Sequence, residues 1–378
     1  MVEDWNVDFK MGRSPELVMR GIMEIKKHII SLCLFFIILA TLGPMASASE
    51  EQTASESETG VYYKVKKGDT LWDISERFFD SPELWPNLWK ENKQITNPHW
   101  IYPGDEIRLH RDISGFDIET PEPEPEEEPK PAAVIEPTPT PEQRPEPAYF
   151  VFNPIDQIGF VKKTPVTASG TIFKSQDDNR LIRTGDTIYI RKLDDESFDP
   201  GSQFTIYRTI RHEKLPDSDF TGGTQHYLVG VAQITVIEPQ FAVGKIIRSY
   251  RSIQAGDLLT PYHERSRKIM ITESKEDIRG RIIGSEGNRT IMGEETVAFI
   301  DKGELDGMVP GQIYRVFYQE KMRESPRYPK EIMLTPIDIG TIFILRTEDN
   351  TSTVLITDAQ RAIYPGTMFR TPTPPGKK

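Results

Sequence analysis

The stretch YYKVKKGDTLWDISERFF (residues 62–79) predicts a strand, a turn and a helix in direct succession. Its first residues alternate as in a short strand, and Gly68 marks the turn that ends it. Thr70, with Asp73 three residues later, resembles a capping box. We therefore expect the helix to begin near Leu71.

The residues that follow complete a small unit. SPELWPNLWKENKQI (residues 81–95) predicts a second helix with proline in its first turn, and NPHWIYPGDEIRL (residues 97–109) supplies two turns and a closing strand. The order is strand-helix-helix-strand within residues 62–109. A core of this size is marginal unless it is rich in aromatic residues. The unit has such residues in Trp72, Trp85, Trp89 and Trp100.

Together these pieces resemble a LysM module, the βααβ domain that binds peptidoglycan and chitin. The resemblance rests on YKVKKGDTLWDIS (residues 63–75) and on NPHWIYPGDEIRL. In that family, a shallow groove between the first-strand-to-helix loop and the second-helix-to-strand loop holds N-acetylglucosamine units. The resemblance implies a glycan-binding site formed by Gly68, Asp69, Thr70 and Leu71 on one side and by Asn97, Pro98, Trp100, Ile101, Tyr102, Pro103 and Gly104 on the other.

The chemistry of these residues suits an acetylated amino sugar, which offers an N–H, a C=O and a methyl group. Gly68 and Gly104 let the backbone approach a ligand closely, and Leu71 and Ile101 can receive the methyl group. The unit is almost neutral, so its affinity should depend little on salt. For Asp69 and its neighbour, a purely structural role in the turn and the helix cap stays open.

The segment MEIKKHIISLCLFFIILATLGPMASA (residues 23–48) predicts a secretory signal within residues 1–48, with Met23 as an alternative start. Its apolar run, residues 29–42, is shorter than the roughly 20 residues that span a bilayer, although an uncleaved anchor stays an alternative. Cys33 is the only cysteine, so the processed chain would have neither a disulfide nor a cysteine nucleophile. We expect an exported protein of the periplasm or cell wall, without a stable membrane span after cleavage.

Two segments have the composition of unfolded chain. Residues 49–61 are rich in Ser, Glu and Thr and are expected to be disordered. Residues 115–148 are an acidic, proline-rich linker, for which polyproline II structure is expected. At about 3.1 Å per residue, such a linker would reach on the order of 90 Å and act as a tether.

The remainder of the chain contains an internal duplication. Glycines recur at a constant offset of 110 residues: Gly170, Gly201, Gly230 and Gly256 correspond to Gly280, Gly311, Gly340 and Gly366. Alternating stretches such as GVAQITV and GTIFILR predict half-buried strands bounded by glycine turns. We expect two tandem all-β, barrel-like repeats at residues 158–262 and 268–372. The fold class is therefore multidomain, with a small α+β module, a linker and two β repeats.

The second repeat carries a further, more limited resemblance. Its stretch TVAFIDKGELDGMVPGQIYRVFYQ (residues 296–319) resembles the C-terminal β-barrel domain of periplasmic flagellar-assembly proteins. The glycines that fit the pattern are Gly303, Gly307, Gly311, Gly340 and Gly366. These glycines indicate sharp turns between strands and do not indicate which ligand the domain binds.

Composition and motifs exclude several classes of function. The net charge of −12 and the lack of any run of five basic residues argue against nucleic-acid binding. The histidines form neither an H-x-H nor an H-E-x-x-H motif, so we expect no metal site and no cofactor. No G-x-S-x-G motif is present, and we name no catalytic residue.

The sequence thus predicts a non-catalytic wall-binding protein. Its module would bind N-acetylglucosamine-containing glycan of peptidoglycan, and its β repeats would bind an envelope protein. A peptidoglycan hydrolase with a carboxylate pair hidden in the β region stays an alternative. A scaffold in which the module is incidental is the third class.

Overall fold

The computed structural model describes residues 58–110, 148–178, 180–193, 198–216, 220–325 and 328–372. The predicted leader and almost all of the predicted disordered segment and acidic linker lie outside these ranges. Among the described residues, no helix is long and apolar enough to cross a membrane.

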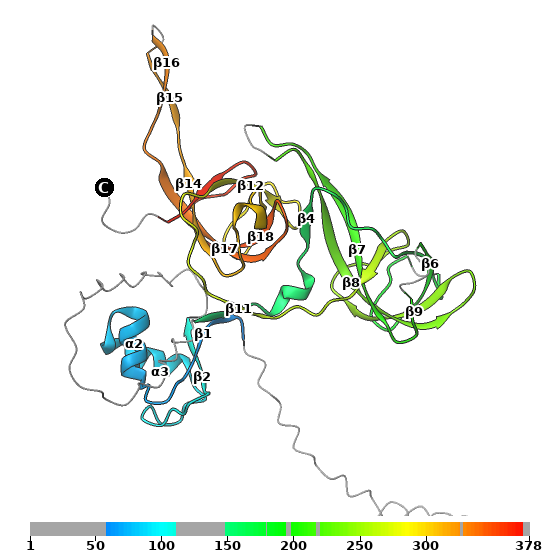
Figure 1. Cartoon of the computed structure of the whole chain (residues 1–378), viewed down its shortest axis with the longest axis horizontal. Helices are drawn as coiled ribbons and strands as arrows, with labels where there is room; N and C mark the ends of the chain where they lie inside the picture. The colour runs from blue at the N-terminus through cyan, green and yellow to red at the C-terminus, as the bar shows by residue number, and fades with distance from the viewer. Residues whose placement is uncertain are drawn as a thin grey trace, which may run out of the picture. The chain divides into compact units, whose positions relative to one another are not determined.

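The N-terminal unit has the predicted βααβ order (Figure 1). It comprises β1 (Gly60–Lys64), α2 (Leu71–Phe79), the 3-10 helix η1 (Pro82–Leu84), α3 (Trp85–Glu91) and β2 (Glu106–His110). β1 and β2 pair antiparallel, and the two helices pack against them through one continuous apolar core.

The capping box predicted for α2 is present. The Thr70 side chain accepts a hydrogen bond from the Asp73 N–H, and the Asp73 carboxylate accepts one from the Thr70 N–H. Each bond satisfies a donor that the first turn of a helix leaves open. The buried face of the helix consists of Leu71, Ile74 and Ser75, in agreement with the helical spacing of the sequence.

The two strands of this unit belong to a larger sheet, which the sequence did not predict. β3 (Tyr149–Val151), which follows the linker, pairs with β1, and β11 (Lys268–Met270), which lies between the repeats, pairs with β3. The strand order is β11-β3-β1-β2. The expectation of a separate module at the end of a tether is therefore wrong for this structure. β1 would otherwise present an unpaired edge, and β3 covers it with three buried apolar residues.

The apolar core of the module continues into the β region. Phe150 of β3 is buried in the same cluster as Ile107 of the module and Phe343 of the second repeat. The rings of Phe150 and Phe343 meet edge to face, with centroids 5.2 Å apart. The module and the second repeat thus share buried apolar surface.

The first repeat folds into a ring of six strands, which we call barrel 1. The strands are β5 (Gly170–Ser175), β6 (Thr187–Lys192), β7 (Gln203–His212), β8 (Gly223–Ile237), β9 (Ala242–Ser249) and β10 (Leu258–Pro261). Their pairings close the ring in the order β5-β6-β9-β8-β7-β10. A further strand, β4 (Phe160–Lys162), pairs with the outer part of β8 and follows the 3-10 helix η2 (Asn153–Gln157).

The second repeat forms a closed barrel, which we call barrel 2. Its strands are β12 (Arg279–Ser285), β13 (Val297–Ile300), β14 (Ile313–Tyr318), β17 (Ile337–Thr347), β18 (Ser352–Ala359) and β19 (Met368–Arg370), with the 3-10 helix η3 (Glu304–Asp306) after β13. The order β12-β13-β18-β17-β14-β19 is that of barrel 1. Even the isolated bridges, Ile182 to Ile253 and Met292 to Ile363, differ by 110 residues.

Each barrel carries a hairpin at the same position. The first arm (described residues 208–216 and 220–227) comprises the outer parts of β7 and β8 and the described residues between them. The second arm (residues 318–337) contains the hairpin of β15 (Lys321–Ser325) and β16 (Tyr328–Met333), which extends beyond β14 and β17 in Figure 1. The all-β repeats of the predicted fold class are thus present, each with an added arm.

Candidate functional site

The two loops that the sequence assigned to a glycan site lie side by side. The Val65 N–H donates to the carbonyl of Asp105 at 2.8 Å, and the Gly104 N–H donates to the carbonyl of Val65 at 2.8 Å. Gly68 and Gly104 have φ angles of +99° and +101°, a conformation that side chains other than glycine rarely adopt. The structure therefore fixes the position of one loop relative to the other through the backbone.

The first loop is held by a network around Asp69. The Asp69 carboxylate accepts hydrogen bonds from the Tyr63 hydroxyl at 2.7 Å and from the Lys66 N–H at 2.8 Å. Arg77 donates to the same tyrosine oxygen at 2.8 Å. Burial raises the pKa of Tyr63 to about 12, so this phenol remains a donor throughout the physiological range. Asp69 thus takes the structural role that the sequence left open.

Two other predicted contact residues are also occupied within the module. The Thr70 side chain caps α2, as described above. Leu71 is only 2% exposed, because its side chain points into the module core. The expectation that Leu71 receives an acetyl methyl group is therefore wrong. Around Gly68, the first loop therefore offers its backbone to a ligand.

The second loop presents aromatic surface. Asn97 organises its start by accepting a hydrogen bond from the His99 N–H at 3.0 Å. Trp100 and Tyr102 follow and are 67% and 63% exposed. Ile101, between them, packs partly against the core. Of the remaining predicted residues, Pro98 is half-buried and Pro103 is exposed.

One exposed aromatic residue was not assigned to the site from the sequence. Trp72, in the first turn of α2, is 49% exposed and directly follows the first loop. The helical spacing carried a signal for it, since a buried face of Leu71, Ile74 and Ser75 leaves Trp72 pointing outward.

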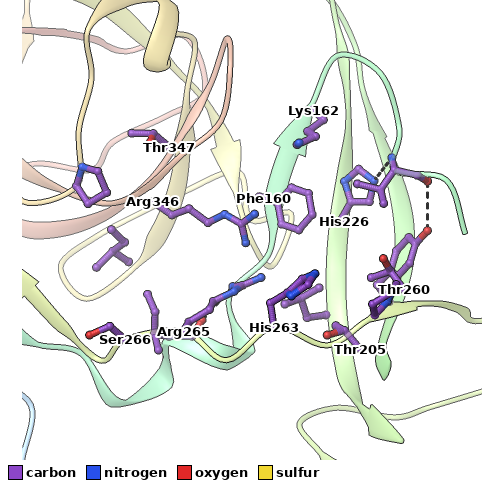
Figure 2. Close-up of a pocket in the computed structure, with 17 residues that line it drawn as sticks. Phe160, Lys162, Thr205, His226, Thr260, His263, Arg265, Ser266, Arg346 and Thr347 are labelled. Atoms are coloured by element: carbon purple, nitrogen blue, oxygen red, sulfur yellow. Dashed lines mark hydrogen bonds between the residues drawn. The ribbon is translucent and has the colours of Figure 1, made fainter. Parts of the chain in front are cut away.

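A second candidate is a cavity of about 520 Å³ between the two β repeats. Figure 2 shows the residues that line it. Three cations line it, Lys162, Arg265 and Arg346, and no Asp or Glu is among the described residues of its lining. The cations already have partners. Lys162 pairs with Glu348 at 2.9 Å, and Arg265 donates to the carbonyls of Ile155 and Ile158. Burial, followed by repulsion from Arg346, lowers the pKa of Arg265 to about 10.

His226 is one of two histidines that line this cavity. It stacks on Phe160 with centroids 4.6 Å apart, and its Nε2 accepts a hydrogen bond from the Val166 N–H at 3.0 Å. Burial lowers the pKa of His226 to about 4, so the ring is neutral at neutral pH. A base with so low a pKa is poorly matched to proton transfer at pH 7.

A second cavity, of about 430 Å³, contains three glutamates, Glu286, Glu294 and Glu295. Glu286 accepts a hydrogen bond from the Gly159 N–H at 2.7 Å and pairs with Arg251 at 3.3 Å. Burial raises its pKa. Its contacts join the segment before β4 to barrel 2, which is a structural role. In the described part of the chain, no three His, Cys, Asp or Glu side chains are placed to hold a metal ion.

Comparisons with known proteins agree with the prediction for the N-terminal unit. The LysM domain family matches residues 63–109. The uncharacterized protein YqbP of Bacillus subtilis is 40% identical over 57 residues, which are 12% of this chain and 26% of that protein. The potassium binding protein Kbp of Escherichia coli is 29% identical over 75 residues, 19% of this chain and half of that protein. The chain thus spans half or less of these two relatives.

A third relative is matched over most of its length. The cell division suppressor protein YneA of Bacillus subtilis is 34% identical over 87 residues, which are 22% of this chain and 79% of that protein. The resemblance of the second repeat to flagellar-assembly proteins stays a prediction. With its two facing loops, its capped helix and these matches, the chain belongs to the LysM-domain proteins.

Proposed function

We propose that the LysM module binds the N-acetylglucosamine-containing glycan of peptidoglycan in the groove between its two loops. LysM domains generally bind peptidoglycan, and they are generally binding modules without catalysis. The observation that carries the proposal is the pair of loops joined through Val65 and Gly104, next to the exposed rings of Trp100 and Tyr102.

The chemistry of this groove fits a neutral acetylated sugar. Gly68 and Gly104 are exposed, so their backbone can approach the acetamido group. Because the Gly104 N–H already donates to Val65, Gly104 would contribute its carbonyl, as an acceptor for the acetamido N–H. The exposed rings of Trp100 and Tyr102 offer apolar faces with polar edges, which suit a ligand that is half apolar. Because Leu71 is buried, the methyl group is assigned to the surface around Ile101.

Affinity is expected to come from repetition of the site. A single shallow groove binds weakly, whereas several copies on a repeating glycan raise the apparent affinity by effective concentration. The module is carried by the shared sheet of β1, β3 and β11, so the β repeats move with it once it is bound.

LysM domains occur in extracellular and cell-wall proteins. Residues 23–48 have the pattern of a secretory signal, and we propose on this ground that the chain is exported to the periplasm or cell wall. We further propose that the β repeats bind an envelope protein. Exposed apolar side chains on both repeats support this, and their geometry is developed in the next section.

The test is sedimentation of the full chain with purified sacculi. The double variant Trp100→Ala/Tyr102→Ala is expected to lower the bound fraction at limiting sacculi, with affinity reduced about tenfold. Tyr364→Ala removes a ring of the second repeat that is 47% exposed and serves as the control. Equal sedimentation of all three proteins would contradict the groove.

The same experiment separates the other two functional classes. A scaffold with an incidental module would leave even the wild-type chain in the supernatant. A hydrolase would release soluble fragments from the sacculi. No comparison supports that alternative.

A further inference from the structure

The first arm is docked on barrel 2. Phe220 near its tip and Val161 of β4 are buried in one cluster with Ile283 and Phe299 of barrel 2. His212 of the arm meets the ring of Phe299 edge to face at 6.0 Å. The chain thus contains one complete interface between a hairpin arm and the outer surface of a barrel.

Hydrogen bonds fix this interface in place. Gln225 of the arm donates to the carbonyl of Glu286 at 3.0 Å. Thr353 of β18 donates to the carbonyl of Gly159 at 3.1 Å, and Thr351 donates to the carbonyl of Val161. The acceptor surface on barrel 2 therefore consists of Ile283 and Phe299, which share a cluster with Phe220 of the arm, and of Thr351 and Thr353, which bond to β4 and to the residue before it.

The offset of 110 residues locates the same surface on barrel 1. Its residues are Phe173, Tyr189, Phe241 and Val243, which take the places of the four acceptor residues of barrel 2. We call this set the aromatic patch. Its three rings are in mutual contact, with centroids 5.7 to 6.3 Å apart. Phe173 is 42% exposed, whereas the equivalent Ile283 is 4% exposed.

The second arm carries apolar side chains with no covering element among the described residues. Met322 and Ile332 lie opposite each other across β15 and β16 and are 55% and 40% exposed. Met333 and Leu334 follow in the chain and are 48% and 39% exposed. The arm and the aromatic patch are thus the two halves of an interface whose intact version, in the part of the chain that the structure describes, lies between the first arm and barrel 2.

We propose that the second arm of one copy docks on the aromatic patch of a second copy. The envelope protein that the β repeats bind would then be a second copy of the same chain. This inference rests on the proposed function, which gives the β repeats the role of binding a partner. Met322 occupies the position of His212, and Tyr189 occupies that of Phe299, so the intermolecular contact places a thioether against an aromatic ring. Such contacts are favourable. The change from histidine to methionine suits an acceptor surface that has become more aromatic.

The geometry makes the association heterologous, because the arm and the patch are different surfaces. In a pair, one copy then retains a free patch and the other a free arm, so further copies add head to tail. A chain of copies presents several LysM modules to one glycan network. This supplies the multivalency that a weak single groove needs.

The test is sedimentation velocity of the full chain up to about 100 µM, with two exposed positions changed to glutamate. The wild type is expected to associate with rising concentration. Met322→Glu and Phe173→Glu are each expected to remain monomeric, because each leaves one half of the interface defective. Leu305→Glu, at a 78% exposed leucine of η3, is the matched control and should associate as the wild type does.

Mixing the two defective variants tests the head-to-tail arrangement directly. Each retains one intact half, so an equimolar mixture should form a 1:1 dimer and nothing larger. A wild-type chain that stays monomeric, association that survives either substitution, or a mixture without dimer would overturn the proposal. Sedimentation of Phe173→Glu with sacculi is read separately, so loss of self-association and loss of glycan binding remain distinguishable.

Discussion

Barrels 1 and 2 share their strand order and differ in what covers them. Barrel 2 is covered by β4 and the first arm, whereas the same surface of barrel 1 is a partly exposed aromatic patch. The interiors correspond closely. Buried residues of barrel 1 have buried counterparts 110 positions later in barrel 2. The pairs include Ile172/Ile282, Ile190/Ile300, Phe204/Tyr314, Ile206/Val316, Ile234/Ile344, Ile246/Ile356 and Leu259/Phe369. Duplication has kept the residues that close the barrel, while the outer surfaces have diverged according to what they contact.

The strongest test of this comparison is a matched pair of truncations. Phe299 is fully buried under the first arm, and Tyr189 is its partly exposed counterpart. Phe299→Ala should lower the free energy of unfolding by about 4 kcal/mol, since it leaves a cavity in the interface. Tyr189→Ala should cost about 1 kcal/mol. Urea denaturation of both variants gives the two values, and equal losses would show that the arm is not packed on barrel 2.

A second prediction concerns pH and is specific to the first repeat. His226 has a pKa of about 4 in the folded chain, below its ordinary value of 6.5, and its counterpart in the second repeat is Pro336. As the pH falls below 6.5, the unfolded chain takes up this proton first. Stability should therefore fall between about pH 6.5 and pH 4, by at most about 3 kcal/mol from this residue.

The control for this prediction is His226→Gln, which can still accept a hydrogen bond from Val166 and does not titrate. Its urea midpoint should change less between these two pH values than that of the wild type. Parallel losses in both proteins would assign the acid sensitivity to carboxylates elsewhere.

The smallest expected effect comes from an ion pair present in one repeat only. Arg208 donates to both oxygens of buried Asp257, at 2.8 and 3.0 Å, and the second repeat has Tyr318 and Thr367 at these positions. Asp257→Thr copies the second repeat and should cost about 2 kcal/mol, because a charge-assisted pair is lost.

Arg208→Tyr in the same chain should recover part of that loss, as the second repeat tolerates this pair of residues. Thermal unfolding of the single and double variants measures both. A single variant as stable as the wild type would mean that the ion pair contributes nothing to barrel 1.

The features predicted correctly from the sequence are local or periodic. The capping box needs only Thr70 and Asp73, and the repeats are read from glycines at one constant spacing. Pairing of β1 with β3 was missed, because it joins residues on opposite sides of the linker and leaves no periodic signal. Leu71 was assigned to the groove by resemblance, although its own helical spacing places it in the core.

The shared sheet also bears on what a break in the chain would do. His110 and Phe150 both lie opposite Val61, one on each side of β1, so the chain leaves the sheet and re-enters it within about 10 Å. A protease that cuts between residues 111 and 147 would sever the covalent path and leave the backbone pairing intact. The two fragments should then co-purify and separate only in denaturant, as halves of a protein that complement each other.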